Sequence, residues 1–152
     1  IVTYTIQKNA ATKRNNFGPP KSTKFIYNQD VLELATKMLK SIGFNGVAHI
    51  DMRIDSENAK VYVIEINPRY WASLFGSLTA GINFPQIALQ SALNEPVNNT
   101  KYQEITFSRL TYWMKKFYKK DVRLKHTNLK FLLKDLEPIL RRKINRLTKK
   151  RQ

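Results

Sequence analysis

One acidic residue interrupts a stretch that otherwise has the composition of a buried β-strand. Glu65 lies in the run from Val61 to Arg69, where most of its neighbours are aliphatic or aromatic. Burying a carboxylate costs several kcal/mol unless a cation or hydrogen bonds compensate for it. Asn67 lies two residues later and so shares a strand face with Glu65. An acid, an amide and a guanidinium at the end of one strand indicate a phosphate-and-metal site.

A second acid belongs to the preceding predicted strand. Residues 46–55 alternate well enough to form a strand, and the polar segment 55–58 is turn-prone, so a β-hairpin is expected. If the hairpin is centred near Asn58, Asp51 lies opposite Glu65, because both are equally far from that residue. Opposed residues share a face, with Cβ atoms about 5 Å apart. A register error of one residue would move Asp51 to the other face.

The predicted acid pair has a clear chemical use. Two carboxylates this close repel each other unless a cation lies between them or one of them holds a proton. Oxygen atoms of Asp, Glu and Asn are ligands that Mg²⁺ accepts, with waters and substrate phosphates completing its coordination. The pattern therefore favours a divalent metal on Asp51, Glu65 and Asn67, with Arg69 nearby. The alternative is a structural ion network in which the acids pair with basic neighbours such as His49.

Three motifs give the chain a family resemblance. They are GVAHIDMR at 46–53, VIEINPRYW at 63–71 and AGINFP at 80–85. Together they resemble the C-terminal part of an ATP-grasp enzyme, in the branches that contain carboxylate–amine ligases, carbamoyl phosphate synthetase and biotin carboxylase. Weaker similarity extends back to about Ile1. The resemblance implies an α+β fold, an antiparallel sheet with flanking helices, for a C-terminal ATP-grasp subdomain over residues 1–97.

The resemblance also implies roles for individual residues. Asp51, Glu65 and Asn67 match the ligands of the Mg²⁺ ions that bridge the phosphates of ATP, and Mn²⁺ could replace Mg²⁺. Arg69 matches the arginine that lies beside the transferred phosphate or the bound carboxylate. The implied reaction is ATP-dependent ligation of a small carboxylate to an amine through an acyl phosphate, which leaves the identity of both substrates open.

The turn after the arginine borders the acceptor-substrate pocket in the resembled ligases. Tyr70, Trp71 and Ser73 are therefore candidate substrate contacts, although packing of Trp71 in the core explains that residue at least as well. Residues 71–93 are predicted to be helical with a break at 81–85. This segment contains small residues that would let the backbone approach a ligand closely, namely Ala72, Ser73, Gly76 and Ser77.

The N-terminal part is predicted as strand, loop and helix. Residues 1–7 alternate like a strand, and residues 8–24 form a basic, polar loop. Beside an ATP site, Lys21 and Ser22 of this loop are candidate phosphate contacts, although a solvated loop is the simpler explanation of each. A helix follows, with Asp30 and Glu33 in a capping-box pattern and Gly43 as its stop, and it is predicted to be core scaffolding.

Other parts expected of an ATP-grasp enzyme are absent from the sequence. A preceding domain and a central ATP-binding domain are missing, and the chain opens on Ile1. We therefore expect a C-terminal fragment of a longer cytoplasmic ligase, inactive by itself and partnered by the missing N-terminal domains; a homodimer is left open. The absence of cysteine excludes disulfides and thiolate metal sites. No apolar run approaches the length of a membrane span.

Positive charge is concentrated in the last third of the chain, after a composition break near 95–100. Residues 101–152 hold 17 Lys/Arg and 4 Asp/Glu, which is 13 of the 16 net positive charges. We predict a basic C-terminal extension over 98–152, with a strand at 105–113 and an amphipathic helix from Asn128, kinked at Pro138. This extension could pack on a missing domain, lie on an anionic membrane surface, or, as the least favoured choice, bind nucleic acid. The rival function is thus a non-catalytic basic binding module.

Overall fold

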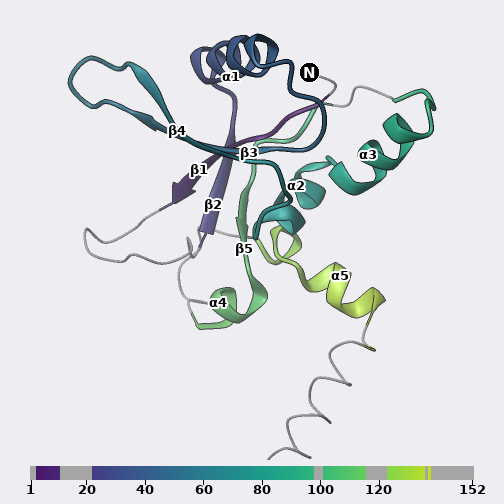
Figure 1. Cartoon of the computed structure of the whole chain (residues 1–152). Coiled ribbons are helices and arrows are strands. Elements are labelled where there is room, and N and C mark those ends of the chain that lie inside the picture. The colour runs from purple at the N-terminus through teal and green to yellow at the C-terminus, as the bar shows by residue number, and fades with distance from the viewer. Residues whose placement is uncertain (1–2, 11–21, 98–100, 116–122, 136, 138–152) are drawn as a thin grey trace, which may run out of the picture.

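The computed structural model describes residues 3–10, 22–97, 101–115, 123–135 and 137. Strands and helices are mixed along the chain (Figure 1). The strands are β1 (Ile6–Ala10), β2 (Ser22–Ile26), β3 (His49–Ile54), β4 (Val61–Asn67) and β5 (Thr106–Ser108). The helices are α1 (Gln29–Ser41), α2 (Leu74–Ala80), α3 (Phe84–Ala92), α4 (Leu110–Lys115) and α5 (Leu129–Lys134), with a 3₁₀ turn, η1, at Leu124–His126.

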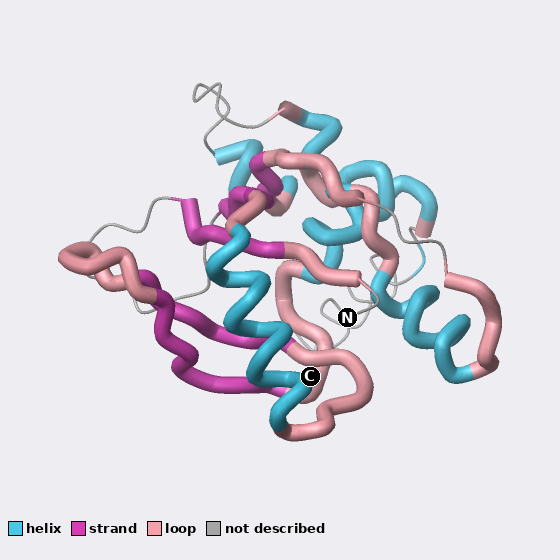
Figure 2. Tube along the Cα trace, turned by 90° about the horizontal axis from the view of Figure 1, so that it is seen from above, coloured by secondary structure: helices cyan, strands magenta, loops and turns pink. Residues whose placement is uncertain are grey.

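The described strands form two antiparallel groups. The first has the order β1-β2-β5, and the second is the β3-β4 hairpin. The α+β class with antiparallel strands and flanking helices is therefore confirmed, but the strands form two sheets instead of the one that was expected. The hairpin and the three-stranded sheet lie beneath the same long helix, α1 (Figures 1 and 2).

The first two strands lie partly inside the segment predicted as a loop. The prediction of a loop over 8–24 is wrong at both ends, since β1 continues to Ala10 and β2 begins at Ser22. In β2, Thr23 and Phe25 are buried while Lys24 points outward, so the strand has one apolar face despite its basic residues. Residues 11–21, which include Lys21, lie outside the described part of the chain.

Helix α1 begins two residues earlier than expected. Its N-cap is Asn28, whose side-chain oxygen accepts a hydrogen bond from the backbone N–H of Val31, so the predicted capping role of Asp30 is wrong. Gly43, at φ +59°, follows the helix end as predicted. Helix α1 crosses the strands (Figure 2), yet none of its residues is fully buried. It is an amphipathic cover over a groove and not the buried scaffold that was predicted.

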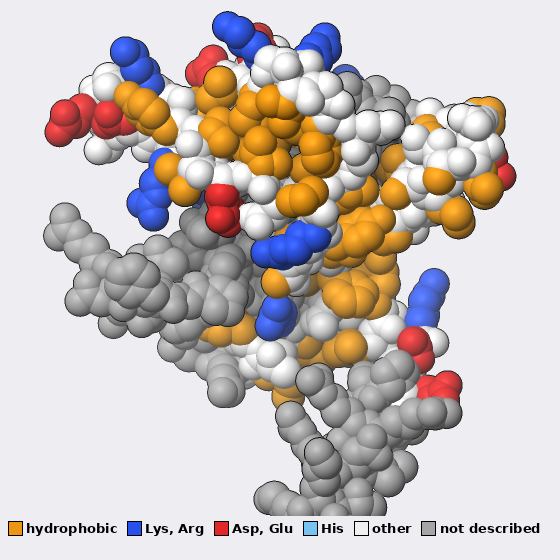
Figure 3. Space-filling view, in the orientation of Figure 1, with side chains coloured by type: hydrophobic (Ala, Val, Ile, Leu, Met, Phe, Trp, Pro, Cys, Tyr) orange, Lys and Arg blue, Asp and Glu red, His pale blue; other side chains and the backbone are white. Residues whose placement is uncertain are grey.

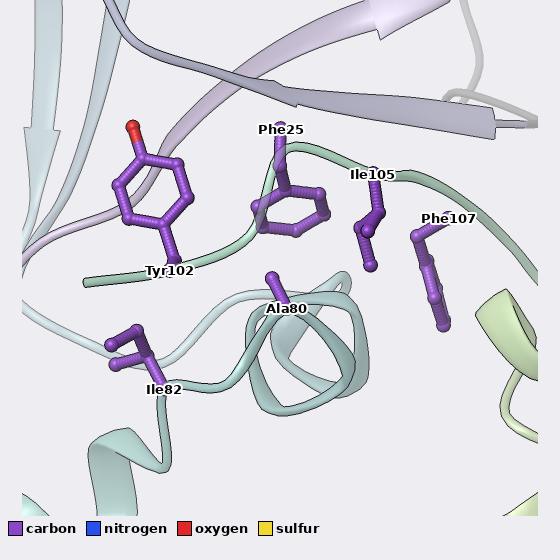
Figure 4. Close-up of a cluster of buried hydrophobic side chains, with 6 residues drawn as sticks. All are labelled: Phe25, Ala80, Ile82, Tyr102, Ile105 and Phe107. Carbon is purple, nitrogen blue, oxygen red and sulfur yellow. The ribbon is translucent and has the colours of Figure 1, made fainter. Parts of the chain in front are cut away.

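The fully packed core lies between β2, α2 and the segment that leads into β5. Figure 4 shows its members, which are Phe25, Ala80, Ile82, Tyr102, Ile105 and Phe107. Packing is tight at Gly76, where an added Cβ would lie 2.9 Å from the Phe25 ring and 3.0 Å from the Phe107 ring. Side chains from both sides of the predicted boundary at 97/98 thus share one core. The division into 1–97 and 98–152 remains a prediction, and any such division has to accommodate this shared packing.

The C-terminal part differs from its prediction in detail. The predicted strand at 105–113 is limited to β5, and α4 follows at once with its first N–H, that of Leu110, bonded to the side chain of Asn128 at 2.8 Å. Helix α5 ends at Lys134 with Asp135 as its cap. Pro138 and the rest of the predicted amphipathic helix lie outside the described residues. Among the helices that the structure describes, none is long and apolar enough to cross a membrane.

Candidate metal and phosphate site

The β3-β4 hairpin places the two acids opposite each other, as predicted. Asp51 pairs with Glu65, and His49 pairs with Asn67. Nearer the turn the register changes by one residue, because Met52 pairs with Val63. Ile64 is therefore the extra residue of a β-bulge.

The bulge explains why Asp51 and Glu65 are paired although the turn is not centred on Asn58. The turn itself is centred between residues 57 and 58, because Asp55 and Lys60 are bonded across it at 2.9 Å. Continued without a bulge, that register would oppose Asp51 to Ile64 and turn Glu65 to the other face. The register assumed from the sequence is thus correct at the acids and wrong at the turn, and the bulge accounts for the difference.

Glu65 is exposed, which overturns the premise that its carboxylate is buried. It lies on the outer face of the hairpin together with Asp51, while Met52 and Val63 on the inner face are half-buried. No burial cost therefore requires a compensating cation. What supports a site here is the geometry of two opposed acids and their polar neighbours.

The acids are held by two side chains at the end of the hairpin. Asn67 donates a hydrogen bond from its Nδ2 to Oε1 of Glu65 at 2.7 Å. His49 Nε2 lies 3.8 Å from Oδ1 of Asp51. The pKa of Glu65 is lowered, first by the hydrogen bond from Asn67, then by one with Asp51, and further by the charges of Arg69 and His49. Glu65 is therefore poised to remain an anion, which is the form that binds a cation.

Removing the amide should reverse part of this effect. We expect Asn67→Ala to raise the pKa of Glu65, because the carboxylate loses the hydrogen bond that contributes most to the shift. Because the pKa of Glu65 is lower in the folded protein than in the unfolded chain, its ionised carboxylate stabilises the fold at pH values above the unfolded pKa. This stabilisation is lost as the pH falls through the folded pKa. Side-chain carboxyl NMR titration of the metal-free protein measures the change. An unchanged pKa in the variant would contradict the assigned hydrogen bond.

Arg69 and Trp71 follow the hairpin and lie close to it. Arg69 donates a hydrogen bond from Nη1 to the carbonyl of Tyr70 at 3.3 Å. Its positive charge contributes to the lowered pKa of Glu65. The Trp71 ring stacks on His49 with 5.5 Å between centroids, and it meets the edge of Phe84 at 4.9 Å. Trp71 is only 9% exposed, and within the described residues its indole Nε1 has no hydrogen-bond acceptor. The packing explanation of this residue is thus supported, while its role in substrate contact stays a prediction.

Ser73 belongs to a polar network that the sequence did not reveal. Its hydroxyl donates to Oε1 of Gln7 at 2.6 Å, and Nε2 of Gln7 lies 3.2 Å from Oγ of Ser77. Gln7 therefore ties the start of α2 to β1. It lies more than sixty residues away in sequence, and no local pattern marks it. The expectation that Gly76 and Ser77 approach a ligand is wrong, because both are buried inside the protein.

The remaining candidates are not all brought together. Ser22 lies in a strand and lines a groove that also includes Asp51 and Ser73, whereas Lys21 is outside the described residues. Tyr70 is 42% exposed and does not line that groove. The groove runs beneath α1 and has a volume of about 1520 Å³. Figure 3 shows many apolar side chains gathered on this face, below the helix.

The donor set fits a divalent cation that is completed by phosphate oxygens. Two opposed carboxylates and one amide offer hard oxygen ligands, and their exposure leaves room for the waters and phosphates that Mg²⁺ retains. The set does not form a closed protein cage. Within the described ranges, no group of three or more His, Asp and Glu side chains could hold a metal ion.

A family model described as "ATP-grasp in the biosynthetic pathway with Ter operon" matches residues 2–116 of the 152. The chain belongs to the ATP-grasp family. The resemblance seen in the sequence is thereby confirmed, and the ATP-grasp match extends beyond residue 97 to include β5 and α4. A search of curated proteins gave no match to the chain. ATP-dependent, ligase-like chemistry is the functional class that this family membership supports.

Proposed function

We propose that the full-length protein joins a carboxylate to an amine with ATP, through an acyl phosphate. The observation that supports this most directly is the opposition of Asp51 and Glu65 on an exposed hairpin face, with Asn67 bonded to Glu65 at 2.7 Å. This arrangement lies inside the segment that the ATP-grasp family model matches. The proposal concerns the full-length protein, in which an ATP-binding domain would be the partner of the segment described here.

The metal-binding residues would be Asp51, Glu65 and Asn67. When bound there, Mg²⁺ or Mn²⁺ would supply positive charge to phosphate oxygens during phosphoryl transfer. The two carboxylates supply the negative charge, and the Asn67 amide orients Glu65 through its hydrogen bond. On binding a cation, the Asn67 side chain would need to turn its oxygen, rather than its NH₂ group, toward the ion.

The proposed reaction has two steps. In the first, an oxygen of the substrate carboxylate attacks the γ-phosphorus of ATP, and the bond from that phosphorus to ADP breaks. In the second, the amine nitrogen attacks the acyl carbon, phosphate leaves with the former carboxylate oxygen, and the amine loses a proton. The Arg69 guanidinium would hold the phosphoryl group or acyl phosphate through paired N–H donors.

The other candidate residues have positioning roles in this proposal. Lys21 and Ser22 would contact phosphate, and Tyr70, Trp71 and Ser73 would border the carboxylate or amine substrate. Gln7 would fix Ser73, because it accepts the Ser73 hydroxyl at 2.6 Å. We propose a cytoplasmic setting for the reaction, where ATP is available and a chain without cysteine needs no oxidising compartment.

Trapping with hydroxylamine tests the acyl phosphate. The full-length protein is incubated with Mg²⁺, ATP and a panel of carboxylates, with hydroxylamine in place of the amine. We expect hydroxamate to form in equal amount to ADP for the true carboxylate. ADP release without hydroxamate would indicate phosphorylation of another group, and AMP release would indicate an adenylate; either result contradicts the proposal. Complete absence of nucleotide binding would favour the non-catalytic module.

A further inference from the structure

The described strands leave two edges without a strand partner beside the groove. Strand β1 pairs with β2, and β3 pairs with β4; among the described strands, the other edge of each has no partner. Both β1 and β3 line the groove beneath α1. A free edge presents a row of backbone N–H and C=O groups, which is a template for another strand.

The residues that line the groove show that it meets these strands at their edges. Strand β3 contributes the consecutive residues 49–52, whereas its partner β4, all of which is described, contributes none. Side chains of consecutive strand residues point to opposite faces, so a cavity over one face would be lined by alternate residues of both strands. Residues 3–8, which lead into β1 and form its first part, also line the groove without a gap. The groove therefore follows the free edges of β3 and β1.

Two helices add apolar faces to the same groove. Helix α1 lies over both sheets (Figure 2), and α3 borders the groove near Trp71. Their apolar side chains in the lining are at helical spacing, namely Val31, Leu32, Ala35 and Leu39 of α1 and Phe84, Ile87 and Ala88 of α3. No residue of either helix is fully buried. An apolar occupant would cover both faces further.

An extended strand matches the free edges and the apolar faces together. A helix satisfies its backbone groups internally and would leave both edges unpaired. A small ligand offers a few polar atoms and not a row of backbone groups. Strands that are covered on both faces have nearly continuous apolar sequences. The groove therefore suits a mostly apolar strand, with a usual length of about five or six residues.

We propose that a mostly apolar β-strand of the full-length polypeptide, from outside residues 1–152, occupies this groove and pairs with β1 and β3. Thr3, Tyr4 and Thr5 lead into β1 and line the groove. A strand that precedes β1 would thus reach the groove over a short turn, and strands consecutive in sequence are usually neighbours. The two sheets would become one, with Asp51 on an interior strand of it. This proposal does not depend on the reaction that the acid pair supports.

Hydrogen exchange in the substrate-free, full-length protein tests the pairing. Residues of β3 direct their amides alternately toward β4 and toward the groove. We expect the groove-facing amides to exchange at least about a hundredfold more slowly than unprotected amides. The outward amides of β4 are the matched control, because β4 does not line the groove, and they should exchange more quickly. Rapid exchange of the groove-facing amides, or equal rates in both sets, would overturn the proposal.

Photo-cross-linking identifies the occupant. The full-length protein is produced with photo-methionine, and links from Met52, which is half-buried and lines the groove, are located by mass spectrometry. We expect Met52 to link, within one polypeptide, to a mostly apolar segment outside residues 1–152. Met114 is the internal control, since it is 64% exposed on α4 and should not link to that segment.

The other possible occupants give different results in the same experiment. Links from Met52 to a second copy, to a segment within residues 1–152 or to an added substrate would each overturn the proposal, as would the absence of any link from Met52. Hydroxamate trapping does not enter either measurement. A failure of the proposed reaction is therefore distinguishable from a failure of the proposed strand.

Discussion

Asp51→Asn and Glu65→Gln are each expected to lower the Mg²⁺-dependent ATP turnover of the full-length enzyme at least about a hundredfold. Each change removes one of two opposed negative charges that would hold the cation against the phosphates. Metal-assisted charge neutralisation contributes several kcal/mol to phosphoryl transfer, and each 1.4 kcal/mol corresponds to about a factor of ten. A coupled assay of ADP release measures the effect. Titration with Mn²⁺, followed by EPR, should show weaker metal binding in parallel.

The matched control is Glu57→Gln in the turn of the same hairpin. Glu57 is exposed and has the same charge, but it is not paired with another acid across the strands. Its substitution should leave turnover within about twofold of the original, because an exposed charge outside the site contributes little. Both site variants should also keep their circular dichroism spectra, since the replaced carboxyls are exposed. Full turnover in both site variants would exclude them as metal ligands.

Phe25→Ala is expected to lower the free energy of unfolding by about 3–5 kcal/mol, the usual cost of emptying a buried phenylalanine site. Phe25 of β2 is 1% exposed. Its ring packs against α2 at Gly76, within the core that also includes the segment leading into β5. The backbone bond from Phe25 N to Ile105 O, at 2.8 Å, does not depend on the side chain. The loss should therefore report packing alone. Equilibrium denaturation in urea measures it.

Leu89→Ala is the control for this second substitution. Leu89 is 60% exposed on α3, so its truncation should change the free energy of unfolding by no more than about 0.5 kcal/mol. A loss as large as that of Phe25→Ala would mean that α3 is covered by something that this chain does not show. A small loss for Phe25→Ala would contradict the assignment of the core.

The hairpin and its acid pair could be predicted because the information is local. Strand alternation, a polar turn and the spacing of Asp51 and Glu65 all lie within residues 46–69, and the first two family motifs lie in or overlap this segment. The exposure of Glu65 could not be predicted, since it depends on which face of the hairpin another element covers. The apolar neighbours of Glu65 suggested burial on both faces, whereas Glu65 and Asp51 are exposed and Met52 and Val63 are half-buried.

Long-range contacts account for most of what the sequence concealed. Gln7 was not recognised because its partners, Ser73 and Ser77, are distant in sequence and meet it only in the fold. Gly76 was interpreted as room for a ligand, but aromatic rings from two strands occupy that space. Asn28 was overlooked as the helix cap because Asp30 and Glu33 offered a matching pattern two residues later. Each error arose where one local pattern permits several tertiary environments.

The β-bulge at Ile64 has a consequence for how this hairpin can vary in length. The extra residue lies between the turn and the acids. The pairing register at Asp51 therefore differs by one residue from the register next to the turn. The ends of the strands, where His49 opposes Asn67, then set the position of the acids. Turns of different length can therefore be exchanged at this tip while the two carboxylates keep their places.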